Sequence, residues 1–200
     1  MPRPSDKVQK PVAASVQPLT RGVAVKPLVT FVRQRGGPQA WDRILAQLPE
    51  GEREMFARPI ATTALYPTTA MINLLRLTVK ELLDSNTERT TEIGAFFLDE
   101  IMNSIYRTFL RLGPIPLMIR KMPILFERFH NAGSLTPFDL EKQSARARLE
   151  HPLLDIVFCR TVAGILIRAF ALLGVKDLVF THERCVAKGD ECCVFRARWK

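Results

Sequence analysis

The C-terminal end of the chain carries the feature that most restricts the fold. Three of the four cysteines and one of the three histidines fall between residues 181 and 199, in two β-type runs that flank a Lys-Gly-Asp stretch at 188–190. Gly189 allows a positive φ, so residues 188–190 are predicted to form the loop of a β-hairpin. In that register Cys185 lies opposite Cys193, and both thiolates reach one metal ion.

A closed metal site needs four ligands, and the first strand of the hairpin offers two candidates for one of them beside Cys185 and Cys193. Strict alternation along a strand places Glu183, not His182, on the face that carries Cys185 and Cys193. His182 therefore needs a β-bulge or twist to join them, and Glu183 is the alternative ligand. Carboxylate and imidazole groups both bind zinc, so the sequence alone leaves this choice open.

The other two cysteines, Cys159 and Cys192, differ in their expected roles. Cys159 lies in a long apolar run before the hairpin, whereas Cys192 points to the opposite face and is expected to take no part. Three cysteines and a histidine form a common structural zinc site. The same thiols could instead be small buried apolar groups, or a disulfide, and the pattern does not exclude either reading.

The closing motif resembles that of a known family. The stretch from Cys185 through Gly189 and Asp190 to Cys193 and Phe195 is similar to the end of the 4-vinyl reductase domain family. That family shares its fold with TRAPP-type and haem–nitric-oxide-binding domains, and it includes sensor domains of aromatic-responsive bacterial activators. The match covers roughly the last fifty residues, and upstream only the order of elements is similar.

The resemblance implies a ligand set. In those sensors zinc is held by a Cys, an acidic residue 23 positions later, a Cys three further and a Cys eight further. The same steps in this chain reach Cys159, His182, Cys185 and Cys193. This chain departs from the pattern at His182, where the sensors carry a carboxylate.

Periodicity predicts an α+β fold, with a helical N-terminal two-thirds packed on a small antiparallel sheet that ends in the C-terminal hairpin. Residues 1–21 contain four prolines and no apolar periodicity, so we expect a flexible basic tail before a single domain over residues 22–200. The predicted helices cover 27–35, 38–48, 50–57, 68–83, 91–112, 116–121, 123–130 and 153–173; the predicted strands cover 141–149, 177–185 and 192–199.

Charge and composition restrict the class of protein. The formal net charge is +9, but no nucleic-acid-binding motif accompanies it, so a solvated basic face is expected and a nucleic-acid partner is not. No apolar run is long enough to predict a membrane span, and the N-terminus does not resemble a signal peptide. These features favour a cytoplasmic protein, in which thiols stay reduced.

Catalytic and cofactor motifs are absent from the sequence. It contains no phosphate-binding glycine loop, no G-x-S-x-G and no H-E-x-x-H. Haem-binding relatives use a Tyr-x-Ser-x-Arg pattern, and the nearest stretch, residues 106–109, does not fit it. The sequence therefore predicts a protein that is not an enzyme and has neither a nucleotide nor a haem cofactor.

Two functions remain. The first is a sensory module that binds an apolar small molecule among its helices and signals through a protein partner, with Tyr66, Phe97, Tyr106 and Phe158 as candidate contacts. Aromatic residues at such positions are more often plain core than ligand contacts. The second is a TRAPP-like scaffold that forms homodimers and binds other proteins without a small-molecule ligand.

Overall fold

The computed structural model describes residues 17–102 and 114–200. Its main sheet is antiparallel in the order β3-β4-β6-β5, formed by Ser134–Phe138, Ser144–Glu150, Cys193–Arg198 and Val179–Arg184. The alternating stretch that predicts a strand near 141–149 is β4, whose alanines and Leu149 face the core while its arginines face outward. The α+β class and the C-terminal hairpin are confirmed.

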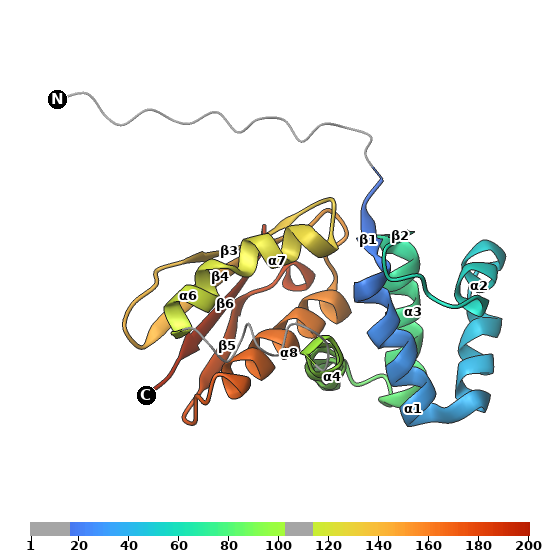
Figure 1. Ribbon diagram of the computed structural model, residues 1–200, viewed down its shortest axis with the longest axis horizontal. Coiled ribbons are helices and arrows are strands. Elements are labelled where there is room, and N and C mark those ends of the chain that lie inside the picture. The colour runs from blue at the N-terminus through green and yellow to red at the C-terminus, as the bar shows by residue number, and fades with distance from the viewer. Residues whose placement is uncertain (1–16, 103–113) are drawn as a thin grey trace.

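Helices make up most of the rest of the described chain. They are α1 (Gly22–Gln47), α2 (Glu50–Ala57), α3 (Thr68–Leu82), α4 (Thr90–Met102), α6 (Ile115–Arg120), α7 (Met122–Phe129) and α8 (Ile156–Leu172). Two 3₁₀ turns, η1 (Thr87–Arg89) and η2 (Val186–Lys188), complete them. Figure 1 shows α1, α2 and α3 gathered at one end of the molecule and the sheet at the other, with α4 and α8 between them.

Three elements differ from the sequence-based boundaries. The two helices expected over 27–35 and 38–48 form one element, α1, which is interrupted by non-helical backbone at Gly37 (φ 70°). Strand β3 is not predicted by the sequence, because a five-residue run that contains Pro137 lacks a clear alternation. Helix α8 begins at Ile156 because Asp155 caps it, its carboxylate accepting a hydrogen bond from the Phe158 N–H at 2.8 Å.

The N-terminal boundary also lies earlier than a tail over 1–21 implies. Leu19–Arg21 form β1, which pairs antiparallel with β2 (Leu65–Pro67). Thr20 is fully buried, and its hydroxyl lies 2.9 Å from that of Thr68. The ordered domain therefore includes residues before Gly22, while residues 1–16 lie outside the described part of the chain.

Helices α4 and α8 cross at very short range. A β-carbon added to Gly94 would collide with the backbone of Thr161, and one added to Gly164 would collide with the backbone of Thr91. Only glycine permits this approach, which fixes α8 between α4 and the sheet. Helix α8 is consequently a shared wall: it packs against α4 on one side, and on the other its Cys159 lies close to His182 of β5 and Cys193 of β6.

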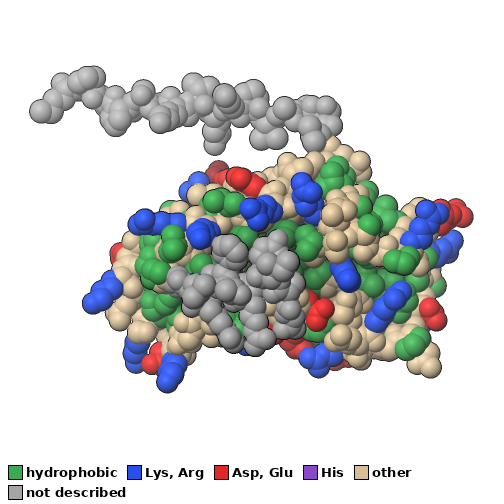
Figure 2. Space-filling model, viewed as in Figure 1, with side chains coloured by type: hydrophobic (Ala, Val, Ile, Leu, Met, Phe, Trp, Pro, Cys, Tyr) green, Lys and Arg blue, Asp and Glu red, His purple; other side chains and the backbone are tan. Residues whose placement is uncertain are grey.

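The surface shows no concentrated basic area on the face drawn in Figure 2, where Lys and Arg side chains are scattered among acidic and apolar ones. Several arginines of the outer sheet face are paired with acids, as Arg146 is with Glu183 at 3.0 Å. Among the described residues, no helix combines the length and the apolar character that crossing a bilayer requires.

Candidate metal centre and ligand cavity

The four residues expected to bind a metal come together in the structure. One donor atom from each of Cys159, His182, Cys185 and Cys193 lies within 4.8 Å of every other. Cys159 belongs to α8, His182 to β5 and Cys193 to β6, so the cluster joins the long helix to the hairpin. All three cysteines are buried.

The β-bulge needed for His182 is present. Phe180 pairs with Ala197 and His182 with Phe195, but the register shifts between His182 and Arg184. The shift turns His182 toward the cysteines. Glu183 instead lies on the other face, where its carboxylate pairs with Arg146 and Arg196 at 3.0 and 3.4 Å. Of the two alternatives, His182 is the one that joins the cluster.

Cys185 is held by the turn rather than by strand pairing. The loop is longer than the three residues predicted: β5 ends at Arg184, and η2 follows before β6 begins. Gly189 adopts a φ of 95°, and Asp190 Oδ2 accepts a hydrogen bond from the Cys185 N–H at 2.7 Å. The Gly-Asp pair of the motif thus orients Cys185, a role that sequence spacing does not reveal.

The distances suit a tetrahedral metal centre better than a disulfide. The Cys159 and Cys185 sulfurs are 3.7 Å apart, well beyond the roughly 2.05 Å of a disulfide bond. Two thiolates bound to zinc at about 2.3 Å with tetrahedral angles lie about 3.8 Å apart. Cys192 is only partly buried and is not a member of the cluster.

Two further observations point to an electrophile at this centre. His182 Nε2 is buried and makes no hydrogen bond of good geometry to a described residue, although the His182 ring helps to lower the pKa of Cys193; a buried nitrogen in this state is costly unless something binds it. The Cys159 thiol, by hydrogen bonding, lowers the pKa of Cys193 below its ordinary value, while the pKa of Cys159 is raised. The cluster thus already favours one thiolate before any ion is considered.

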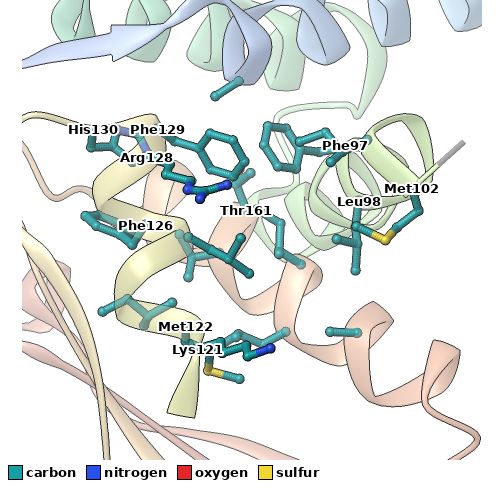
Figure 3. Close-up of a pocket in the computed structure, with 18 of the residues that line it drawn as sticks. Phe97, Leu98, Met102, Lys121, Met122, Phe126, Arg128, Phe129, His130 and Thr161 are labelled. Carbon is teal, nitrogen blue, oxygen red and sulfur yellow. The ribbon is translucent and has the colours of Figure 1, made fainter. Parts of the chain in front are cut away.

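A cavity lies on the other side of α8. It has a volume of about 440 Å³, within the range of about 300–1,000 Å³ that is typical of small-molecule pockets. Its walls come from α4, α6, α7 and α8, with contributions from α1, α3 and β3. Figure 3 shows α7 on one side and α4 on the other, with α8 passing between and behind them.

Two of the four candidate ligand contacts lie at the cavity. Phe97 of α4 and Phe158 of α8 line the cavity. Tyr66 lies elsewhere: it is buried beside the start of α1, and its hydroxyl accepts a hydrogen bond from the Ala61 N–H at 3.0 Å. Tyr106 lies outside the described residues.

The polar groups of the cavity are not among the ligand contacts expected from the sequence. They are Lys121, Arg128, His130 and Thr161, and the other lining residues are apolar. His130 Nδ1 lies 3.1 Å from the Thr20 hydroxyl, and burial together with neighbouring His151 lowers the pKa of His130 to about 3. The two cations lie one at the start and one near the end of α7, and their spacing of seven residues is the signal that could have found them.

Comparison with known proteins places the fold. No family model and no curated protein matches the chain. An H-NOX protein from S. oneidensis in the Fe(II)NO ligation state is similar over 90% of this chain and 99% of its own, with a TM-score of 0.72 and 14% identity. The fold is that of the H-NOX proteins.

Two further H-NOX structures agree. The unliganded Fe(II) protein from K. algicida covers 90% of this chain and 96% of its own, with a TM-score of 0.69 and 14% identity. A mutant H-NOX protein from T. Tengcongensis has a TM-score of 0.68 at 12% identity, with 90% of this chain and 97% of its own covered. The haem–nitric-oxide-binding part of the resemblance is confirmed at the level of fold, and membership of the 4-vinyl reductase domain family is not.

The expectation of no haem was wrong. The similar structures include Fe(II) states of H-NOX proteins and one that probes heme distortion in that family, with a TM-score of 0.69. A Tyr-x-Ser-x-Arg motif describes one way of holding haem, so its absence from a sequence does not exclude haem from the fold.

The donors in the cavity are compatible in kind with such a group. His130 is the one histidine among the described lining residues, and its low pKa keeps the imidazole neutral at pH 7. Its Nδ1 contacts Thr20, which leaves Nε2 as the nitrogen for an iron. Lys121 and Arg128 would suit the carboxylates that haem carries.

Proposed function

We propose that this chain is a non-catalytic, cytoplasmic ligand-binding module of the sensory type, which holds a largely apolar organic molecule in the cavity beside α8 and signals through a protein partner. The observation that carries the proposal is the cavity itself. Well-packed domains leave few voids larger than a water molecule. The cavity beside α8 has a volume of about 440 Å³ and is lined almost entirely by apolar side chains.

The metal centre supports the cavity in this proposal. Cys159, His182, Cys185 and Cys193 would bind one zinc ion with four protein ligands, which leaves no open position for a reactive water. Such an ion contributes folding energy and does no chemistry. It would fix α8 to the hairpin, so that one wall of the cavity stays in place while a ligand binds on the other side.

Haem belongs to the class of molecules that the cavity admits by its chemistry. If haem is the occupant, it supplies an iron that binds small gases, His130 would hold that iron, and the apolar walls would exclude water. The similarity to H-NOX proteins favours testing haem first, although it extends to the fold alone.

Native mass spectrometry of the purified protein, with elemental analysis, tests both parts. We expect one zinc per chain, and an added organic mass that is lost on denaturation. Absorption spectra before and after incubation with haem show whether a Soret band appears, and we expect His130→Ala to weaken that band if haem is the ligand.

Two results would contradict the proposed function. Metal-free protein purified without chelator would exclude the zinc centre. A stable homodimer that takes up neither haem nor a neutral apolar dye such as N-phenyl-1-naphthylamine would exclude the ligand-binding module and favour the TRAPP-like scaffold.

A further inference from the structure

Two cations line a cavity that is otherwise almost wholly apolar. Figure 3 shows Arg128 and Lys121 extending from the region of α7 toward α8, with the Arg128 guanidinium directed toward Thr161. Both belong to the wall of the cavity. The Thr161 hydroxyl already donates a hydrogen bond to the Val157 carbonyl at 2.8 Å, so the charged donors among the described lining residues are these two cations.

Neither cation has a counter-charge among the described residues. The described lining residues include no Asp or Glu, and no ion pair or side-chain hydrogen bond joins Lys121 or Arg128 to any described residue. Residues 103–113, which the structure does not describe, contain no acidic residue in their sequence. By contrast, arginines on the neighbouring helices are paired: Arg168 of α8 contacts Asp99 at 2.8 Å, and Arg76 of α3 contacts Asp155 at 2.8 Å.

We propose that the ligand is an amphipathic organic anion, with an apolar body among the phenylalanines and methionines and a carboxylate received by Arg128 or Lys121. This inference rests on the proposed function, and it names the chemical class that the cavity selects. A guanidinium binds a carboxylate through two parallel hydrogen bonds. Lys121 is partly buried and Arg128 is exposed, so an anionic head group held there keeps contact with water while its apolar body fills the cavity.

The spacing of the two cations limits how they share a ligand. They are seven residues apart in sequence, which on helical geometry separates their α-carbons by roughly 10 Å. One carboxylate is therefore held directly by one cation, while the other raises the positive potential of the cavity. A ligand with two acidic groups would contact both.

The test uses displacement of N-phenyl-1-naphthylamine, a neutral apolar dye, by three probes that share one chain: decanoate, decan-1-ol and decylamine. For the wild-type chain we expect decanoate to bind on the order of tenfold more tightly than decan-1-ol, and decylamine to bind least. In the double variant Lys121→Gln/Arg128→Gln, that preference should disappear while binding of the dye and of decan-1-ol persists.

Arg120→Gln/Lys142→Gln is the matched control. It removes the same charge from exposed positions that do not line the cavity, and it should retain the preference for decanoate. Dye binding with equal affinity for decanoate and decan-1-ol would overturn the anion proposal and leave the apolar ligand site standing. Loss of the preference in the control variant would also overturn it, because the effect would then be one of net charge. Failure of both the dye and haem to bind the wild-type chain would instead refute the proposed function itself.

Discussion

The two sides of α8 carry different kinds of site: a cluster of donor atoms on one side and a cavity on the other. Toward the hairpin, Cys159 joins three other donors, and the four donor atoms lie within 4.8 Å of one another. Toward α4 and α7, Phe158 and its neighbours leave a volume of about 440 Å³ with few polar groups. One helix thus carries both a site that depends on the geometry of its donor atoms and a site that depends on unfilled volume. The first should fail when one donor is lost, and the second should tolerate change until the volume is filled.

The largest effect is expected at the metal centre. Replacing Cys185 with Ser removes one of four ligands and should lower the free energy of unfolding by several kcal/mol, on the order expected for loss of a structural zinc. Replacing Cys192 with Ser should change it little, because Cys192 is outside the cluster. Thermal denaturation and elemental analysis of both variants measure this, and equal stability would show that the cluster binds no structural ion.

The next prediction concerns the close crossing of α4 and α8 at Gly94. Gly94→Ala forces a β-carbon into the backbone of Thr161, so we expect destabilisation of about 1–3 kcal/mol or more. Gly51→Ala, which meets nothing within 4 Å in α2, should be neutral or slightly stabilising. Urea denaturation compares the two, and a neutral Gly94→Ala would mean that α4 and α8 can separate freely.

Acid should weaken the cavity side through its buried histidines. Burial is the main cause that lowers the pKa of His130 to about 3 and that of His151 to about 4. The unfolded chain takes up these protons below about pH 6.5 while the folded chain does not, so stability falls as pH drops from about 6.5 toward 4. Each histidine contributes a slope of about 1.4 kcal/mol per pH unit in that window.

Urea denaturation between about pH 7 and pH 5 measures that slope in the wild-type chain and in His130→Gln/His151→Gln. The metal centre is acid-sensitive in both proteins, so the difference between the two slopes isolates the histidines. Equal slopes would mean that the folded chain protonates both rings without cost.

The smallest effect on stability should come from filling the cavity. Ala169 lines it, whereas Ala171 of the same helix is exposed and does not. Ala169→Trp should change stability by no more than about 1–3 kcal/mol, the ordinary cost of added volume, yet abolish binding of N-phenyl-1-naphthylamine. Ala171→Trp should leave dye binding unchanged. If dye binding survives Ala169→Trp, the dye does not occupy this cavity.

Residue spacing along the chain predicts part of the metal cluster and leaves part of it open. Strand periodicity predicts the hairpin, the shared face of Cys185 and Cys193, and the need for a bulge before His182 can join them. It cannot decide between His182 and Glu183, because a one-residue register shift moves a side chain to the other face at little local cost. The outward pairing of Glu183 with Arg146, a residue of another strand, accompanies that choice.

The sequence by itself determined the α+β class, the hairpin and the identity of the sulfur donors, since each depends on the period of a single element or on residues near one another in the chain. Only the tertiary structure decided the cavity, the placement of Tyr66 away from it, and the convergence of Lys121, Arg128 and His130 on it. A cavity is the space left when several helices pack, and no local pattern encodes a volume that depends on where glycines such as Gly94 let two helices meet. For the same reason the absence of a haem motif was a poor guide: a motif records how a ligand is held, whereas the room for one depends on how the helices pack.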